Sequence, residues 1–302
     1  MYVIETRRLA KRYGTIHALG GIDLCVPRGS IFGFLGPNGA GKTTTMRILV
    51  GLLRPTAGRA DVLGLDAVRR STEIRRRIGY LPGDVRLYEW MTGRQLLSFC
   101  DAARGGGAGN EIHRLRERFD LNLDRRIRDY SRGMKQKLGL IAALAHRPEL
   151  LVLDEPTTAL DPLVQQTLYD ELRAAAAEGR TVLFSSHTLS EVELLCDRVA
   201  IIRSGLLIED DTIERLRGRA VRHVTLRLRG GAAAGLRLPD GAATTALHDG
   251  EISMSWKGEI GPLIGWLAGL DLADVAIGPP DLEDLFAAYY RNDQDDSPEA
   301  PR

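Results

Sequence analysis

The residues best suited to chemistry lie between Gly36 and Thr43, where the chain reads Gly-Pro-Asn-Gly-Ala-Gly-Lys-Thr. The spacing G-x-x-x-x-G-K-[ST] is typical of a phosphate-binding loop. Its glycines let backbone N–H groups approach phosphate oxygens, because no Cβ stands in the way. In such a loop Lys42 brings a positive charge to the β- and γ-phosphates, and the Thr43 hydroxyl ligates Mg²⁺. We expect the phosphates to be bound by Gly36, Asn38, Gly39, Ala40, Gly41, Lys42, Thr43 and Thr44.

The segments on either side of the loop are those expected around a phosphate-binding loop, with a buried strand before it and a helix after it. Residues 30–35 form a short apolar run, typical of a buried strand, and residues 44–52 have the apolar spacing of a helix. The N-terminus of that helix would point at the phosphates, where its partial positive charge stabilises an anion. A glycine-rich turn that matches the pattern by chance is the alternative, and the order strand, loop, helix argues against it.

A pair of carboxylates follows a second buried run. Residues 150–153 are apolar, and Asp154 and Glu155 come directly after them. Four apolar residues followed by acids are typical of a core strand that ends at a catalytic edge. We expect Asp154 to hold Mg²⁺, directly or through water, and Glu155 to accept the proton of an attacking water. The alternative is an exposed acidic strand end without a role in catalysis.

His187 and Tyr13 gain a possible role from their positions. His187 follows the apolar run 181–186, so a core strand would deliver it to the same edge, where we expect it to contact the γ-phosphate as a catalytic residue. A lone histidine is more often a structural residue. Tyr13 precedes the strand break at Gly14, and its ring is suited to stacking on adenine. A core or rim position is the alternative for this tyrosine.

The stretch Tyr-Ser-Arg-Gly-Met-Lys-Gln at residues 130–136 precedes an apolar helix at 138–145. Ser131 is a good helix N-cap, which is the structural interpretation. The functional interpretation is a second anion site, formed by the Ser131 hydroxyl, the Gly133 backbone and the helix N-terminus.

Size and composition restrict the class of protein. The chain has 302 residues, with 41 basic and 40 acidic side chains, so its net charge gives no argument for a nucleic-acid partner. The N-terminal residues lack the apolar core of a secretory signal, and no apolar run approaches the roughly 18 residues of a membrane helix. The scattered cysteines are interpreted as reduced thiols of a cytoplasmic protein. The arginines at 75–77 are interpreted as a solvated face rather than a contact with anionic lipid.

The chain pattern predicts two domains. Residues 1–217 alternate between strands and helices, with a mainly helical insert at 87–145 that a glycine-rich loop at 104–110 interrupts. Near residue 218 the pattern changes to that of a small α+β accessory domain, which extends to residue 291. Residues 221–229 alternate, strands are predicted at 252–256 and 275–277, and helices are predicted at 260–270 and 282–290. The acidic, proline-containing residues 292–302 are predicted to be a disordered tail.

Six features follow one another along the chain: the aromatic residue, the phosphate loop, the Ser-x-Gly stretch, the Asp-Glu pair, Ala-Leu-Asp and the histidine. In this order they resemble the ATP-binding subunits of ABC transporters over residues 1 to about 217. The ending Pro-Asp-Leu-Glu-Asp-Leu-Phe at 280–286 is similar to that of ABC-2 and daunorubicin-resistance-type drug-exporter subunits. The resemblance implies an α/β P-loop NTPase fold with a RecA-like core sheet, an antiparallel β subdomain and a helical signature subdomain. The small C-terminal α+β domain would be added to it.

The resemblance also implies a function. Such subunits hydrolyse ATP with Mg²⁺ to power transport, here of a drug-like, lipid or polysaccharide cargo in the export direction. Two copies pair head to tail, so that Ser131 and Gly133 contact the nucleotide held by the partner subunit's Lys42, and Asp161 lies in the loop between the two sites. The simplest assembly is a homodimer on the inner face of the cell membrane, bound to a separate integral membrane permease. Nucleic acid is not an expected partner.

Two departures from the family pattern leave alternatives open. Arg132 occupies a position where many members have glycine, which leaves Ser131 and Gly133 in place. The glutamine that normally follows the Tyr-Leu-Pro strand is replaced by Gly83, with Asp84 next to it. One alternative is therefore a slowly hydrolysing regulatory subunit, although Glu155 and His187 argue against it. The other is an ABC ATPase without a membrane partner, although the chain has one set of motifs and no sustained heptads.

Overall fold

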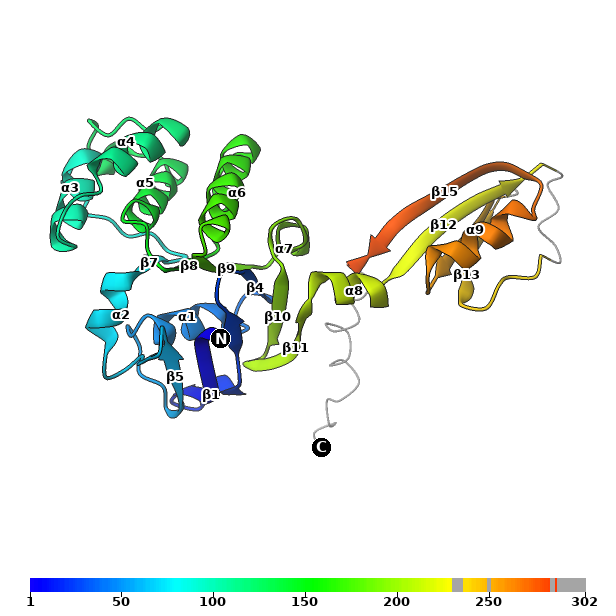
Figure 1. Ribbon diagram of the computed structural model, residues 1–302, viewed down its shortest axis with the longest axis horizontal. Helices are drawn as coiled ribbons and strands as arrows, with labels where there is room; N and C mark the ends of the chain where they lie inside the picture. The colour runs from blue at the N-terminus through cyan, green and yellow to red at the C-terminus, as the bar shows by residue number, and fades with distance from the viewer. Residues whose placement is uncertain (230–235, 249–250, 283–285, 287–302) are drawn as a thin grey trace, which may run out of the picture. The chain divides into compact units, whose positions relative to one another are not determined.

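The computed structural model describes residues 1–229, 236–248, 251–282 and 286. The chain divides into two compact units, Met1–Asp211 and Thr212–Arg302 (Figure 1). The domain boundary expected at residues 217 and 218 falls inside helix α8 (Ile213–Arg219), which belongs to the second unit. The predicted tail from residue 292 lies outside the described residues.

A six-stranded sheet forms the centre of the first unit, with the order β11-β10-β4-β9-β8-β7. The pairs β10–β4, β4–β9, β9–β8 and β8–β7 are all parallel. Strands β4, β8 and β9 are buried along their whole lengths, which explains their nearly continuous apolar sequences. The strands are β4 (Ile31–Leu35), β7 (Ile78–Leu81), β8 (Leu150–Asp154), β9 (Thr181–Ser186), β10 (Arg198–Arg203) and β11 (Leu206–Thr212).

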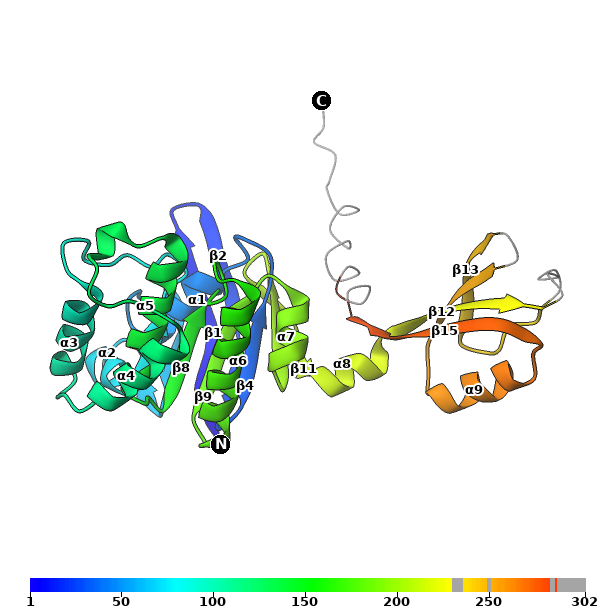
Figure 2. The ribbon, with the colours of Figure 1, turned by 90° about the horizontal axis from the view of Figure 1, so that it is seen from above.

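Helices accompany this sheet in the alternating manner expected of an α/β fold (Figures 1 and 2). Helix α1 begins directly after the phosphate loop, and α6 begins at a proline after an Asp161 cap, an arrangement that fits the missing N–H of proline. The helices are α1 (Lys42–Leu49), α2 (Ser71–Arg77), α6 (Pro162–Ala177) and α7 (Leu189–Leu195). Within the described residues, no helix is both long and apolar enough to cross a membrane.

A second, antiparallel sheet has the order β2-β1-β5-β6, with β3 paired to β1. Its apolar side chains share one buried core with α1 and the central sheet; Ile4, Met46 and Val152 come from these three parts and are almost fully buried. The antiparallel β subdomain is therefore packed into the unit that carries the loop. Its strands are β1 (Tyr2–Tyr13), β2 (Ile16–Ile22), β3 (Cys25–Pro27), β5 (Ala57–Val62) and β6 (Leu65–Asp66).

The helical insert comprises α3 (Gly93–Ala103), α4 (Gly109–Arg118), the short 3-10 helix η1 (Ile127–Asp129) and α5 (Arg132–Leu144). A capping box between Thr92 and Gln95 starts α3, and Ser131 caps α5. The glycine-rich interruption is shorter than the sequence suggests, because α4 already begins at Gly109.

The second unit contains a four-stranded antiparallel sheet with the order β13-β14-β12-β15, and helix α9 packs on one face of it. This α+β architecture matches the expectation from the sequence, but strand β13 was not predicted, and β15 is longer than the predicted 275–277. The elements are β12 (Val221–Leu228), β13 (Ala242–His248), β14 (Glu251–Trp256), α9 (Ile260–Ala268) and β15 (Leu272–Asp281). The helix predicted at 282–290 lies mostly outside the described residues.

Candidate nucleotide-binding and catalytic site

The parallel strands bring the chemistry-bearing residues to one edge of the central sheet. Strand β4 ends at the phosphate loop, β8 ends at Asp154, and β9 lies between them and leads to His187. The register pairs Leu35 with Ser186 and Asp154 with Ser185, so the three strands end at nearly the same level. Three segments that are distant in sequence therefore meet where ligands of open α/β sheets bind.

Two glycines of the loop are required by their surroundings. A Cβ on Gly36 would lie 2.2 Å from the Ile202 carbonyl oxygen, which is backbone and has little freedom to move. Gly41 has a φ of +110°, and a Cβ there would lie 2.8 Å from the Ala18 carbonyl oxygen. The loop therefore holds its curvature against β2 and β10 only because these positions lack side chains.

Lys42 is buried at the base of the loop. Its Nζ donates to the carbonyl oxygens of Gly36 at 2.5 Å and Pro37 at 3.2 Å, and it lies 3.3 Å from Glu155 Oε1. Only 5% of the Lys42 side chain is exposed, so its charge acts in a poorly screened environment. A buried ammonium pointing along the loop is suited to stabilising phosphate oxygens.

Glu155 lies between two nitrogen atoms. Its Oε1 faces Lys42, and its Oε2 lies 3.4 Å from Nδ1 of His187. The residue has a φ of +47°, an uncommon conformation for a non-glycine residue, which turns the chain sharply at the end of β8. Such backbone strain is found at functional sites, where surrounding contacts enforce it.

Asp154 has one satisfied and one unsatisfied carboxylate oxygen. Oδ1 accepts a hydrogen bond of 2.7 Å from Ser185 Oγ, whereas Oδ2 is buried and has no hydrogen-bond partner among the described residues. A buried acceptor without a donor is costly unless a cation balances it, so Asp154 fits a hard divalent cation such as Mg²⁺. The described residues contain no cluster of three or more His, Cys, Asp or Glu side chains that could hold a metal, so the ligands besides Asp154 would be the Thr43 hydroxyl, phosphate and water.

An open hollow unites the loop and Glu155. It is lined by Ala18, Pro37, Asn38, Gly39, Gly41, Lys42, Thr43, Thr44 and Glu155. The Thr43 hydroxyl, the loop amides and the Lys42 ammonium thus surround one space, and Glu155 stands at its rim. The arrangement is suited to binding a triphosphate and activating a water beside it.

Three residues of this site were not predicted from the sequence. Ala18 of β2 lines the hollow. Ser185 Oγ accepts from the Glu155 N–H at 2.9 Å while donating to Asp154, so one hydroxyl fixes both acidic residues. Gln136 of α5 donates from Nε2 to the Pro156 carbonyl oxygen at 2.9 Å, which ties the helical insert to the end of β8. The only signal for Ser185 was its place at the end of a buried strand.

Among the predicted residues that do not line the hollow, four belong neither to the loop nor to the acidic edge of the sheet. Ser131 caps α5, accepting from the Met134 N–H at 3.2 Å, and Asp161 caps α6, accepting from the Val164 N–H at 3.0 Å. A Cβ on Gly133 would lie 2.6 Å from the Ala159 carbonyl oxygen, so close packing already requires this glycine. The fourth, Tyr13, is 46% exposed and has Lys11 Nζ 5.2 Å from its ring centroid. Their predicted contacts with nucleotide stay predictions.

Gly83 lies directly beside the unsatisfied oxygen of Asp154. A Cβ on Gly83 would be 3.2 Å from Asp154 Oδ2. The neighbouring Asp84 is 66% exposed and pairs with Arg86 at 2.7 Å, so its carboxylate is engaged at the surface. Asp84 therefore does not take the place beside Asp154, and even a Cβ at residue 83 would pack tightly against Oδ2.

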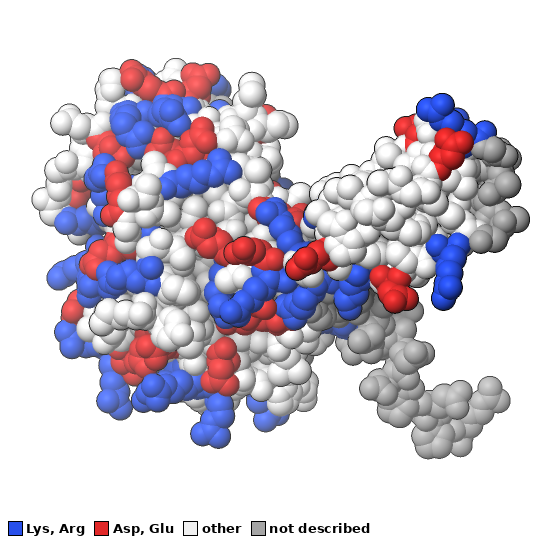
Figure 3. Space-filling view, turned by 45° about the vertical axis from the view of Figure 1, so that its right-hand side comes forward, with Lys and Arg blue, Asp and Glu red and all other residues white. Residues whose placement is uncertain are grey.

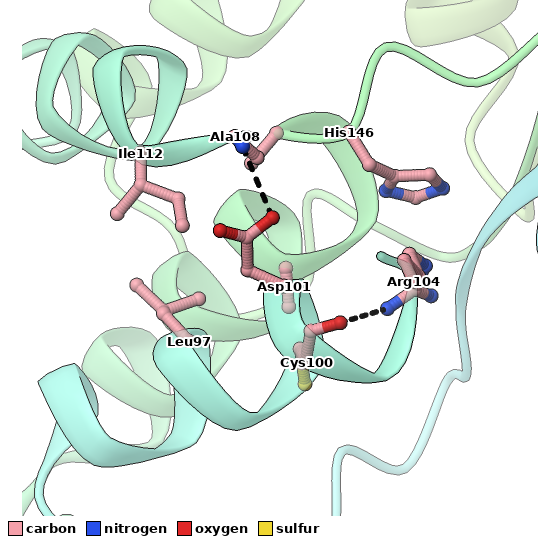
Figure 4. A pocket seen from close by; sticks show the side chains of 9 residues that line it. Leu97, Cys100, Asp101, Arg104, Ala108, Ile112 and His146 are labelled. Carbon is pink, nitrogen blue, oxygen red and sulfur yellow. Dashed lines mark hydrogen bonds between the residues drawn. The ribbon is translucent and has the colours of Figure 1, made fainter. Parts of the chain in front are cut away.

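A separate small pocket lies between α3, α4 and α5 (Figure 4). Burial raises the pKa of the Cys100 thiol and lowers the pKa of His146, which therefore remain neutral near pH 7. Asp101 Oδ1 accepts from the Ala108 N–H at 3.0 Å, as a structural tie between α3 and α4. These features are those of a helix junction, whereas the groups suited to catalysis lie at the sheet edge.

The fold and the site together define a P-loop nucleotide hydrolase. Comparison with known proteins then gives the family: the model for the ABC transporter family matches residues 19–158. The daunorubicin resistance ATP-binding protein DrrA3 of Streptomyces coeruleorubidus is 40% identical over 299 residues, covering 94% of each chain. The bacitracin transport ATP-binding protein BcrA of Bacillus licheniformis is 38% identical and covers 75% of each chain.

Solved structures agree with this assignment. The structure of an ATP-binding subunit of an ABC transporter superposes with a TM-score of 0.65 at 30% identity, covering 71% of this chain and 92% of that chain. The cassette MJ0796 in a post-hydrolysis state with ADP and phosphate has a TM-score of 0.63 at 22% identity, which shows a shared fold. The chain belongs to the ATP-binding proteins of ABC transporters, and it is an ATPase that powers transport. The predicted fold class and enzyme class are confirmed.

Proposed function

We propose that this chain drives export of a drug-like compound, as one of two identical ATPase subunits attached to a membrane permease. The observation that best supports this proposal is that the phosphate loop, Asp154 and Glu155 lie together at one edge of the central sheet. The names of two relatives, for daunorubicin resistance and bacitracin transport, support a bulky antibiotic-like cargo over a lipid or polysaccharide. The relative DrrA3 matches over 94% of the chain, so the support extends to the C-terminal unit.

In the proposed mechanism the loop amides and Lys42 bind the β- and γ-phosphates. Thr43 and Asp154 would hold Mg²⁺, whose charge would offset that of the phosphates. Glu155 accepts the proton of the attacking water, and His187, 3.4 Å from it, orients that carboxylate and contacts the γ-phosphate. Lys42 additionally stabilises the charge that develops in the transition state.

The pairing of two copies is supported by residues that one chain leaves at its surface. Ser131 and Asp161 are exposed although neither is needed for the core, and Ser131 stands at the N-terminus of the 13-residue helix α5. A helix N-terminus with a serine cap is suited to binding phosphate. We infer that Ser131 and Gly133 contact the ATP on the loop of a second copy, and that Asp161 lies between the two sites.

Attachment to a membrane subunit is supported by exposed aromatic residues near the site. Tyr88 and Trp90 are 56% and 66% exposed, on the irregular segment that leaves β7 after Gly83. Glu89 of this segment pairs with Lys135 of α5 at 2.8 Å. The segment that carries Tyr88 and Trp90 therefore joins the edge of the sheet near Asp154 to helix α5, which Ser131 caps. We propose that the permease docks here, which would place the chain on the inner face of the membrane.

The decisive experiment compares Glu155→Gln with Lys42→Ala in a steady-state ATPase assay. Glu155→Gln keeps the side-chain shape but removes the proton acceptor, so turnover should fall by about 10²–10⁴-fold while ATP still binds. The blocked protein should form a dimer with ATP, and adding Ser131→Arg should abolish that dimer. Lys42→Ala should weaken ATP binding as well as turnover. Unchanged turnover of Glu155→Gln would refute its role as the base.

Gly83 supports a second candidate, a regulatory subunit that hydrolyses ATP slowly. Gly83 has no side chain that could help to position a water beside Asp154 Oδ2. Turnover of the wild-type protein separates the two candidates. Wild-type protein that binds ATP but shows no turnover above the uncatalysed background would favour the regulatory subunit.

A further inference from the structure

The outward face of helix α9 differs in its residue types from the surfaces of the other described helices. The helix spans Ile260–Ala268 and packs Leu263 and Leu267 onto the sheet of the C-terminal unit. It contains no charged side chain, yet Ile260 and Ile264 are 40% and 51% exposed. A broad uncharged face of this unit is visible in Figure 3.

Two parallel rows of residues form the exposed face. Residues four apart lie along one line of a helix, so large residues in such a line form a ridge and small residues form a groove. The ridge consists of Ile260, Ile264 and Ala268, and the groove beside it consists of Gly261, Gly265 and Gly269. All six residues are exposed.

The contacts within the chain do not explain two of the groove glycines. A Cβ on Gly261 or Gly265 would meet no other atom within 4 Å among the described residues, and neither residue has a positive φ. Glycine in a helix is less stable than alanine, because it loses more conformational freedom on folding. A groove that no described residue fills has a physical purpose if another backbone approaches it.

We propose that this face is an interface between two copies of the chain. Around a two-fold axis, the ridge of one α9 enters the groove of the second, and the reverse contact forms at the same time. Such an interface requires a surface that is complementary to itself. A face with a ridge, an adjacent groove and no charge satisfies that requirement, because a charged patch would repel its own copy.

The charges at the two ends of α9 favour an antiparallel pair. Exposed Lys257 and Glu259 precede the helix, whereas Arg229 and Asp271 lie at its C-terminal end, 70% and 83% exposed. A two-fold axis across the helix brings each end near the opposite end of the copy. Lys257 then faces Asp271 of the partner subunit, and Glu259 faces Arg229 of the partner subunit. The helix dipoles also run in opposite directions.

The contact is expected to be weak by itself. A nine-residue helix is only about 13 Å long, so it buries much less area than a stable standard-size interface. The contact needs no nucleotide.

The test is sedimentation velocity of the full-length protein without nucleotide, over a concentration series up to the solubility limit. We expect a reversible monomer–dimer equilibrium that Gly265→Leu weakens by at least about tenfold, because a leucine fills the groove. Ile264→Glu should weaken it similarly. Gly218→Leu is the matched control: a Cβ there also meets no described atom, but α8 is rich in charge, so the equilibrium should not change.

Gly265→Ala provides a check on folding, because alanine should raise thermal stability while it weakens the dimer. A wild-type chain that stays monomeric throughout the series would overturn the proposal, as would a dimer that Gly265→Leu leaves unchanged. Binding of phosphatidylglycerol vesicles that Gly265→Leu strengthens would identify a lipid contact instead and would also overturn it. Ser131→Arg should leave the nucleotide-free dimer intact, so this result does not depend on the ATP-dependent pairing.

Discussion

The hydroxyl of Ser185 is the contact whose removal tests the geometry of the catalytic edge most directly. Ser185 is fully buried at the end of β9. Its Oγ donates to Asp154 Oδ1 at 2.7 Å and accepts from the Glu155 N–H at 2.9 Å. Ser185→Ala therefore removes one small group that holds the two acidic residues of the site, while it leaves every loop residue in place.

The expected size of the effect follows from these two bonds. The buried Glu155 N–H would lose its acceptor, which costs about 1–3 kcal/mol, and the Asp154 carboxylate would lose a charge-assisted bond of about 1.5–3 kcal/mol. Allowing for partial relaxation, the free energy of unfolding should fall by about 2–4 kcal/mol. A displacement of Glu155 by about 1 Å should reduce kcat by roughly 10–10²-fold, with little change in ATP affinity.

The assay is ATP hydrolysis at saturating ATP, with urea unfolding of the same samples. Ser186→Ala is the control: Ser186 Oγ donates to Glu191 and accepts from the Thr188 N–H at 2.8 Å, so it stabilises the turn after β9 without contacting either acid. It should lose stability but retain kcat. Wild-type kcat in Ser185→Ala, or an equal loss in Ser186→Ala, would refute the idea that this hydroxyl positions Glu155.

Three other changes have predictable results. Gly36→Ala should abolish measurable ATP binding in a binding titration, because its Cβ would clash with the Ile202 carbonyl oxygen at 2.2 Å. Glu171→Ala should lower the free energy of unfolding in urea by about 1–3 kcal/mol, since this buried carboxylate binds two partly exposed arginines of α4. Burial lowers the pKa of His146 below its ordinary 6.5, so the unfolded chain binds a proton first and stability falls as the pH drops through 6.5. His146→Gln should flatten that slope in urea titrations from about pH 7.5 to about pH 5.5.

The sequence by itself determined the features that depend on local spacing. The loop at residues 36–43 is recognisable because the backbone conformation that surrounds phosphate needs glycines and a lysine at fixed positions. Strands β4, β8 and β9 were predictable because strands buried on both faces are apolar throughout. Their order along the chain, with β4 leading into the loop and β8 into the acidic pair, also predicted that Asp154 and Glu155 would lie near the loop.

Other features arise from contacts between distant residues, which no local pattern records. Arg75, expected to face solvent, donates to the carbonyl oxygens of Val50 and Gly51 at 3.3 and 3.1 Å, at the C-terminal end of α1. The neighbouring Arg77 pairs with Glu149 at 2.7 Å. Only the fold brings these groups together, so the sequence could not distinguish a solvated arginine from one that caps a helix.

The catalytic edge of the sheet also has some features that the sequence determines and others that only the tertiary structure determines. The types of Asp154 and Glu155 were evident from the sequence, but the free Oδ2 of Asp154 and the hydroxyl that fixes both acids depend on the register between β8 and β9. The close approach of Gly133 to the Ala159 carbonyl oxygen likewise exists only after α5 has packed near the end of β8. Local sequence determines which groups are present, because backbone conformation and burial pattern are short-range properties. Tertiary structure decides which of them meet, because a hydrogen bond requires two atoms within about 3 Å whatever their separation in sequence.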